Sequence, residues 1–374
     1  MSLSDDLIST GNRLLLSNYG RAPVVMSRGL GCQLFDVEGR RYLDMSSGIA
    51  VCVLGHGDAG LAQALYNQAT RLHHTSNLYF IETQVRLAEA LARRFQTVVR
   101  AQPERTEFVA FEGSFHGRTM GALSVTGQAK YRQHFGPLIP GVKFITFGDL
   151  ESARGAINDK TAAVIVEPIQ AEGGINLPPP GYLQELRKLC HERGALLIYD
   201  EVQTGIGRTG TFYAFEKEGA VPDVITLAKG LAGGVPMGAM AANDEVAKGF
   251  EPGTHASTFG GNPLASAAAL YLQSAIDDRK LLARCQEMGA YLGSALLRLA
   301  ERRRPKTRGA RGRGLLQGLV MDGDAGPVIA KARERGLLLT VAGGTVVRFA
   351  PALIVTRDEL DEALGILDGV LADV

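Results

Sequence analysis

The sequence predicts an α/β fold in which helices flank a mostly parallel sheet, with a smaller α+β domain built from both ends of the chain. Three observations lead to this prediction. The chain has 374 residues, enough for a large core and two domains. Its middle part alternates short apolar runs with helical stretches, and its two flanks do not. No internal repeat is present, which excludes a solenoid or a propeller.

The apolar runs of the middle part are typical of buried strands, and they lie at 106–113, 162–169, 195–202 and 222–230. Residues 182–194 carry a helical pattern between two of these runs. Strands that alternate with helices form parallel βαβ units, so we expect helices on both faces of the sheet.

Polar residues stand at or just past the end of each predicted strand, namely Glu112, Glu167, Asp200 and Lys229. A single polar residue there can simply mark where a strand meets solvent. Four in succession, however, would gather at the carboxyl edge of a parallel sheet, which is where such sheets bind ligands.

The flanks have a different pattern. Residues 18–44 contain turn signals and short alternating segments typical of hairpins, and the last ninety residues mix helices with short strands. We therefore expect residues 1–45 and 287–374 to form the small domain and residues 46–286 to form the large one.

Composition excludes several classes of function. The chain has 45% hydrophobic and 21% charged residues, with 40 basic against 39 acidic groups, so nothing favours nucleic acid. The absence of an 18-residue apolar stretch argues against a membrane span, and the N-terminus does not resemble a secretory signal, so we expect a cytoplasmic protein. The basic run at 301–313 is interpreted as a solvated surface linker.

The four cysteines, Cys32, Cys52, Cys190 and Cys285, lie far apart and show no metal-ligand spacing. We therefore expect reduced thiols, no disulfide framework and no metal site.

Lys229 stands among apolar and small residues in TLAKGLAGG. Removal from water lowers the pKa of a lysine and increases its neutral, nucleophilic fraction, as covalent catalysis requires. The alternative is an ordinary surface charge. Asp200 ends an apolar run, and a carboxylate there needs a cationic partner, either a protonated pyridine nitrogen or a structural ion pair.

GIGRTG at 205–210 fits the dinucleotide-binding pattern and follows a predicted strand, which makes a nicotinamide dehydrogenase a rival hypothesis. In such enzymes the strand leads directly into the glycines, whereas here DEVQT intervenes. This rival is disfavoured.

Five co-linear segments closely resemble the class III aminotransferases of the fold-type-I family, which use pyridoxal 5'-phosphate (PLP). They are FEGSFHGRT (111–119), VEPIQAEGG (166–174), DEVQTGIGRTG (200–210), TLAKGLAGGVPMGAM (226–240) and HASTFGGNPLA (255–265). Within the class, SSGIAVCVLGH (46–56) and VVRFAPAL (346–353) are most similar to the acetylornithine-type branch.

The resemblance implies a cofactor role for seven residues: Phe115, Asp200, Glu201, Val202, Gln203, Lys229 and Thr258. Lys229 matches the lysine that binds PLP covalently, and Asp200 the partner of its pyridine nitrogen. Gln203 matches the partner of the ring hydroxyl, while Phe115 and Val202 match the pair that sandwiches the ring. Thr258 matches a phosphate ligand that comes from the neighbouring subunit, which implies a homodimer.

The resemblance also implies roles in substrate binding. Arg118 and Tyr19, with Ser257 nearby, match positions that hold the α-carboxylate end of ornithine-type substrates. Arg348 matches the arginine that binds the α-carboxylate of glutamate or 2-oxoglutarate. Glu167 matches the glutamate that masks this arginine in the other half-reaction.

The activity implied is transfer of the terminal amino group of N2-acetyl-L-ornithine to 2-oxoglutarate. The products would be N-acetylglutamate 5-semialdehyde and L-glutamate, as in arginine biosynthesis, and the kinetics would be ping-pong. Succinylornithine, ornithine, 4-aminobutyrate and a lysine-derived amine remain alternative substrates, because motifs do not encode pocket shape. A non-catalytic relative of these enzymes is a more remote alternative.

The chain departs from the family at one place. Relatives carry a strand, a small-residue loop and a helix between the positions of Phe95 and Gln96, and here that block of ~25 residues is absent. The missing loop and helix N-terminus cradle the cofactor phosphate in the family. Either the chain truly lacks this block, or a segment is left out between Phe95 and Gln96.

Overall fold

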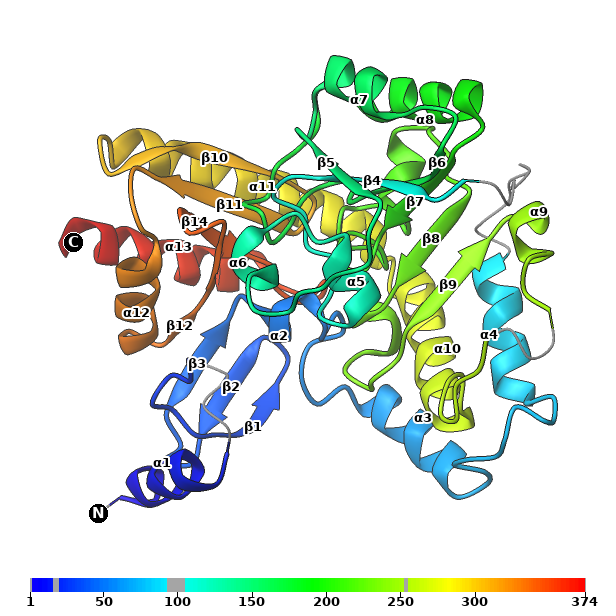
Figure 1. Cartoon of the computed structure of the whole chain (residues 1–374). Coiled ribbons are helices and arrows are strands. Elements are labelled where there is room, and N and C mark those ends of the chain that lie inside the picture. The colour runs from blue at the N-terminus through cyan, green and yellow to red at the C-terminus, as the bar shows by residue number, and fades with distance from the viewer. Residues whose placement is uncertain (1, 16–19, 93–104, 252–254, 374) are drawn as a thin grey trace.

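The computed structural model describes residues 2–15, 20–92, 105–251 and 255–373 (Figure 1). Its centre is a six-stranded sheet of order β5-β4-β6-β7-β8-β9. The strands are β4 (Glu107–Phe111), β5 (Val142–Ile145), β6 (Thr161–Val166), β7 (Leu196–Asp200), β8 (Val224–Leu227) and β9 (Ala239–Ala242). All neighbouring pairs are parallel except β8 and β9. The predicted α/β class and all four predicted strands are confirmed.

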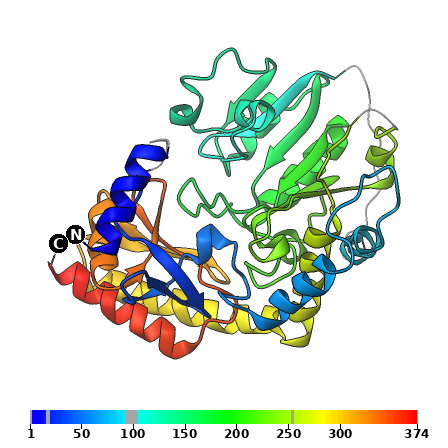
Figure 2. The same cartoon turned by 90° about the horizontal axis from the view of Figure 1, so that it is seen from below.

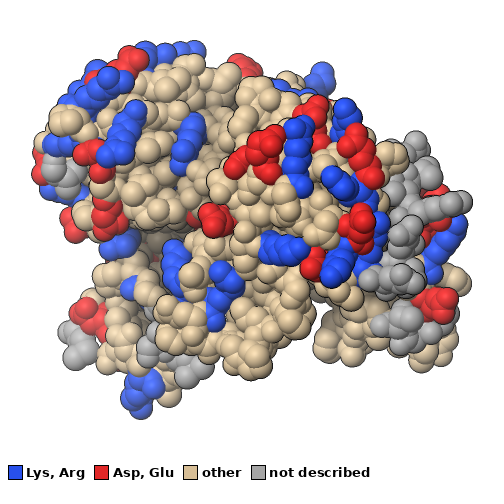
Figure 3. Space-filling model, turned by 45° about the horizontal axis from the view of Figure 1, so that its top comes forward, with Lys and Arg blue, Asp and Glu red and all other residues tan. Residues whose placement is uncertain are grey.

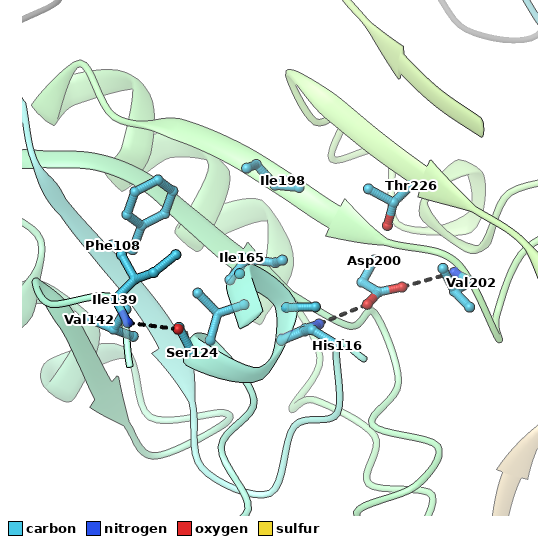
Figure 4. A pocket seen from close by; sticks show the side chains of 13 residues that line it. Phe108, His116, Ser124, Ile139, Val142, Ile165, Ile198, Asp200, Val202 and Thr226 are labelled. Atoms are coloured by element: carbon cyan, nitrogen blue, oxygen red, sulfur yellow. Dashed lines mark hydrogen bonds and ion pairs between the residues drawn. The ribbon is translucent and has the colours of Figure 1, made fainter. Parts of the chain in front are cut away.

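One face of the sheet packs on α8 (Tyr182–Arg193). Tyr182 contacts Phe111 of β4, with ring centroids 6.5 Å apart. The helix ends at Gly194, whose φ of 65° suits glycine in a left-handed cap. On the opposite face lies the short α5 (Met120–Ser124), and a mainly apolar cavity of about 430 Å³ remains between α5 and the strands (Figure 4). Because strand side chains alternate between faces, Ile165 and Ile198 point into this cavity while their neighbours are buried below α8.

The remaining helices of the middle part are α2 (Ser47–Ala50), α3 (Ala59–Ala69), α4 (Glu82–Ala92), α6 (Ala129–Arg132), α7 (Leu150–Ala156), α9 (Asp244–Ala247), α10 (Pro263–Asp278) and α11 (Leu281–Arg302), with the 3₁₀ turns η1 (Ala214–Lys217) and η2 (Lys229–Ala232). The start of α10 is set by sequence, since the Asn262 side chain accepts from Ala265 N and Pro263 occupies the first turn.

The two flanks of the chain meet in a second sheet, as Figures 1 and 2 show. After α1 (Leu3–Leu14), the antiparallel strands β1 (Met26–Leu30), β2 (Gln33–Asp36) and β3 (Arg41–Asp44) follow, and β12 (Leu337–Leu338) pairs in parallel with β3. A third sheet has the order β10-β11-β14-β13, built from β10 (Thr307–Arg313), β11 (Leu316–Met321), β13 (Thr340–Ala342) and β14 (Val346–Phe349). The helices α12 (Gly326–Glu334) and α13 (Arg357–Asp373) complete this part.

The interpretation of 301–313 as a linker is wrong. This run forms the end of α11 and all of β10. Its arginines pair locally: Arg303 with Asp368 at 2.5 Å and Arg308 with Asp322 at 2.6 Å. Acidic and basic side chains are interspersed on the face that Figure 3 displays. No helix within the described ranges is long and apolar enough to cross a membrane.

Candidate active site

Lys229 follows the end of β8 and begins η2 with a φ of 40°. A lysine rarely adopts this left-handed conformation, and such strain is concentrated at functional sites. Burial lowers the pKa of Lys229; Glu172, Glu167 and Asp200 oppose this shift, and Arg348 adds to it. The shift increases the neutral fraction of the amine, as expected for a lysine that reacts as a nucleophile.

Asp200 ends β7, and its side chain is 7% exposed. Its Oδ1 accepts from Val202 N at 3.0 Å, and its Oδ2 lies 2.8 Å from His116 Nδ1 (Figure 4). No Lys or Arg forms an ion pair with this carboxylate among the described residues. A buried carboxylate with spare acceptor capacity fits the protonated ring nitrogen of PLP.

His116 is a residue that the sequence analysis missed. Its side chain is only 2% exposed. Burial lowers the pKa of His116, but the hydrogen bond and charge of Asp200, together with the charge of Glu167, raise it above its ordinary value. The contact with Asp200 therefore favours the protonated form of His116. The sequence did offer one indication of a role for His116, namely its position directly after Phe115 in the FHGRT motif.

Phe115 and Val202 are close in sequence to the two residues of this contact, since Phe115 precedes His116 and Val202 follows Asp200 by two positions. The Phe115 ring packs edge-on against Tyr131 at 5.5 Å, and Val202 lines the apolar cavity together with Asp200 and His116.

Glu201 does not belong to this group, which corrects its predicted cofactor role. Its side chain is buried on the other side of the strand end, where it accepts from Ala214 N, Phe215 N and Thr204 Oγ1 at 2.8–3.0 Å. Successive side chains of a strand point to opposite faces, so Asp200 and Glu201 cannot both face the same ligand. Burial raises the pKa of Glu201 to about 7.

Arg348, on β14, is buried and pairs with Glu172 through Nη1 and Oε1 at 2.6 Å. It also donates to Thr340 Oγ1 and Gln203 Oε1. The predicted pairing with Glu167 is therefore wrong. Glu167 lies at the end of β6 and points to Phe115, whereas the chain turns back before Glu172, whose carbonyl accepts from Gly343 N. Both glutamates occur in VEPIQAEGG, so spacing alone did not distinguish them.

Gln203 takes part in the same network, because its Nε2 donates to Glu172 Oε1 at 3.0 Å. The residue predicted to bind the ring hydroxyl thus also links the arginine to its carboxylate. The group consisting of Lys229, Glu172, Gln203 and Arg348 is called the arginine cluster below.

The remaining predicted residues that the structure describes are exposed. Arg118 is exposed, with its guanidinium carbon 4.1 Å from the centre of the Tyr131 ring. Ser257 and Thr258 are exposed before α10, and the Ser257 carbonyl accepts from Asn77 Nδ2. Glu112 is exposed after β4 and does not join the other strand-end residues. Tyr19 and the junction at 95–96 lie outside the described residues.

The dinucleotide hypothesis finds no support in the geometry of residues 205–210. The segment after β7 consists of turns up to η1, and no helix follows the glycines directly. Arg208 is buried and donates to the carbonyl oxygens of Leu315 and Pro351, so the glycines serve to place this arginine against the C-terminal part of the chain.

Comparison with known proteins identifies the family. The family model for class III aminotransferases matches residues 16–98 and 88–371. An acetylornithine aminotransferase from Gloeobacter violaceus is 47% identical, with 96% of each chain covered, and one from Methanothermobacter thermautotrophicus is 40% identical, with 99% of this chain and 100% of the relative covered.

Solved structures of aminotransferases are also similar to this chain. An ornithine aminotransferase from Toxoplasma gondii, whose structure contains PLP at partial occupancy, is 31% identical over 99% of this chain and 94% of its own, with a TM-score of 0.94. An acetylornithine aminotransferase from Elizabethkingia anophelis is 28% identical over 99% of both chains, with a TM-score of 0.88. The chain therefore belongs to the class III aminotransferases, enzymes that use PLP as their cofactor.

Proposed function

We propose that this protein transfers the terminal amino group of N2-acetyl-L-ornithine to 2-oxoglutarate, giving N-acetylglutamate 5-semialdehyde and L-glutamate in arginine biosynthesis. The observation that carries the substrate assignment is the 40–47% identity, over nearly the whole chain, to acetylornithine aminotransferases of a bacterium and an archaeon.

Four residues would hold the cofactor. Lys229 would bind it covalently, Asp200 would face its ring nitrogen, and Phe115 and Val202 would contact its two faces. PLP supplies an electron-accepting ring and a carbon that carries the amino group between substrates. The contact between Asp200 and His116 at 2.8 Å orients the carboxylate toward this task.

Lys229 would act as the general base and acid. Its Nζ would accept the proton released from the substrate carbon and would later release that proton again. The burial that lowers the pKa of this amine brings it closer to neutral pH, where a base can both accept and release a proton.

The pair formed by Arg348 and Glu172 would select between the two half-reactions. While the Glu172 carboxylate is paired with the Arg348 guanidinium, that guanidinium cannot bind a substrate carboxylate. The site would then accept a substrate whose neighbouring segment is uncharged. The α-carboxylate of 2-oxoglutarate can replace the Glu172 carboxylate, because both form the same type of charge-assisted hydrogen bond. This alternation would let one site accept both substrates in turn, as a ping-pong mechanism requires.

We infer that the active enzyme is a homodimer. Supporting this, large apolar side chains are exposed next to one another: Tyr79 is 69% exposed, Phe80 98% and Phe259 70%. Asn77 joins their two segments by donating to the carbonyls of Ser257 and Gly260. Exposed apolar patches of this kind mark interfaces, and a second copy here would also bring Thr258 to the partner's cofactor.

We also infer that the chain lacks the strand-loop-helix block of its relatives. The family model supports this, because it matches in two pieces that meet at residues 88–98. The cofactor phosphate would then depend on Thr258 of the partner subunit.

We also propose that residues 1–45 and 287–374 form one small domain. The pairing of β3 with β12 supports this.

The test is a substrate comparison with purified protein reconstituted with PLP. We expect kcat/KM for acetylornithine to exceed that for succinylornithine, ornithine, 4-aminobutyrate and lysine by at least about tenfold, a difference of roughly 1.4 kcal/mol in transition-state binding. If kcat/KM is higher for one of these other amines than for acetylornithine, that amine is the substrate instead. Failure to form glutamate from any of them, with Lys229→Ala as the blank, supports a non-catalytic protein.

A further inference from the structure

Glu167 does not pair with Arg348 as predicted, and it makes two other contacts. It lies at the end of β6 and is 5% exposed. One carboxylate oxygen accepts from Phe115 N at 2.8 Å, and the other accepts from Ala171 N at 3.1 Å. A carboxylate that accepts backbone N–H bonds on both oxygens holds two chain segments at a fixed separation.

Both of these segments carry residues of the site. Phe115 directly precedes His116, which contacts Asp200. Ala171 directly precedes Glu172, which pairs with Arg348, and the Ala171 carbonyl itself accepts from Arg348 Nη1 at 3.4 Å. Glu167 thus connects the residues around the cofactor ring to the arginine cluster.

The charges around Glu167 come from different elements. Burial raises the pKa of Glu167 to about 7; His116 opposes this shift, Asp200 adds to it, and the bonds from Phe115 and Ala171 lower it. Lys229 is also close enough to interact with it electrostatically. The carboxyl group therefore changes its charge near neutral pH. Once protonated, it carries an O–H on one oxygen, which then accepts poorly from a backbone N–H.

We propose that Glu167 is a positioning residue whose ionised carboxylate holds the Phe115–His116 segment and the Ala171–Glu172 turn together, so that the protein is preorganised to bind PLP. The kinetic consequence for transamination rests on the proposed function, but the binding of PLP does not.

The experiment measures the dissociation constant of PLP by absorbance titration between pH 6 and 8.5, without any amino donor. For the wild-type protein we expect weaker binding as pH falls through about 7. In Glu167→Gln, the amide oxygen can serve only one of the two N–H groups. We expect its dissociation constant at pH 8.5 to rise about tenfold, with a flatter pH dependence, because one buried acceptor is lost.

Glu201→Gln is the matched control. Glu201 is also buried, accepts from two backbone N–H groups and from Thr204, and has a pKa raised to about 7. Its backbone partners are Ala214 and Phe215, which carry no site residue. Both variants should lose a similar amount of thermal stability. Only Glu167→Gln should change the dissociation constant of PLP more than about twofold.

Two results would overturn the proposal. The first is equal changes of PLP affinity in the two variants, which would reduce Glu167 to a structural carboxylate. The second is a dissociation constant of the wild-type protein that does not change between pH 6 and 8.5, a result that stands even where Glu167→Gln fails to fold. Because no amino donor is present, either result leaves the acetylornithine assignment intact, and a failed substrate assay leaves the role of Glu167 intact.

Discussion

At the scale of single residues, the chemistry depends on a few side chains held by buried polar contacts. Asp200 has His116 on one oxygen and the Val202 amide on the other, and Arg348 has Glu172, Gln203 and Thr340 around its guanidinium. These contacts hold the Asp200 and Arg348 side chains in place, so substituting either residue should impair function more than the loss of packing alone would.

Lys229→Ala should abolish turnover, because no other lysine stands at the end of β8 to bind the cofactor and move the proton. The visible absorption of covalently bound PLP should disappear as well. A variant that keeps this absorption would contradict the assignment of Lys229.

Asp200→Asn should still bind PLP but react at least about a hundredfold more slowly, since the ring nitrogen loses the charge that keeps it protonated. Single-turnover absorbance measurements with acetylornithine would test this. Near-normal rates would remove Asp200 from its proposed role.

Arg348→Ala should raise KM for 2-oxoglutarate by about tenfold to a hundredfold, the range for losing a charge-assisted hydrogen bond, and should spare the half-reaction with acetylornithine. Arg118→Ala should do the reverse. The two half-reactions can be measured separately by following the cofactor spectrum with one substrate at a time, and equal damage to both in each variant would contradict this division.

At the scale of elements, a part-buried ion pair between His56 and Asp44 holds the segment that runs from β3 through α2 to α3. His56 Nε2 lies 2.7 Å from Asp44 Oδ2, and the Asp44 Oδ1 accepts from the backbone N–H groups of Ser46 and Ser47. The His56 backbone also exchanges two hydrogen bonds with Gly31. The same segment contains Val53, whose side chain lies so close to Gly230, the residue after Lys229, that a Cβ added there would come within 3.1 Å of it.

The pair predicts how stability changes with pH. The hydrogen bond to Asp44 raises the pKa of His56 to about 9, above its unfolded value near 6.5. A raised folded pKa means that the stabilisation is fully present below pH 6.5 and is lost as pH rises through about 9. We expect His56→Gln to lose up to roughly 3 kcal/mol of unfolding free energy at pH 6 and much less at pH 9.5. Denaturant unfolding at both values tests this, and an equal loss at both would exclude the ion pair as its cause.

At the scale of the whole molecule, the exposed apolar side chains near Thr258 connect assembly to catalysis. Phe80→Lys should place a charge in the proposed interface and shift the protein toward monomer, with activity falling in parallel, because the partner's Thr258 is then lost from each site. Sedimentation velocity measures the assembly. Leu297→Lys, at a half-exposed leucine of α11, controls for the added charge, and a monomeric wild-type protein with full activity would refute the proposal.

The sequence by itself predicted the class of fold and the four central strands, because apolar periodicity is a local property of the chain. Short motifs that resemble the family led to the proposal of Lys229, Asp200 and Arg348 as site residues. The sequence did not determine which glutamate faces Arg348, that His116 supports Asp200, or that Glu201 turns away. These depend on which face of a strand end a side chain occupies and on how the loop after β6 returns toward β14. Only the tertiary structure decides them, because the partners are separated by 14 positions for Glu201 and Phe215, 84 for His116 and Asp200, and 176 for Glu172 and Arg348, and no local spacing encodes such contacts.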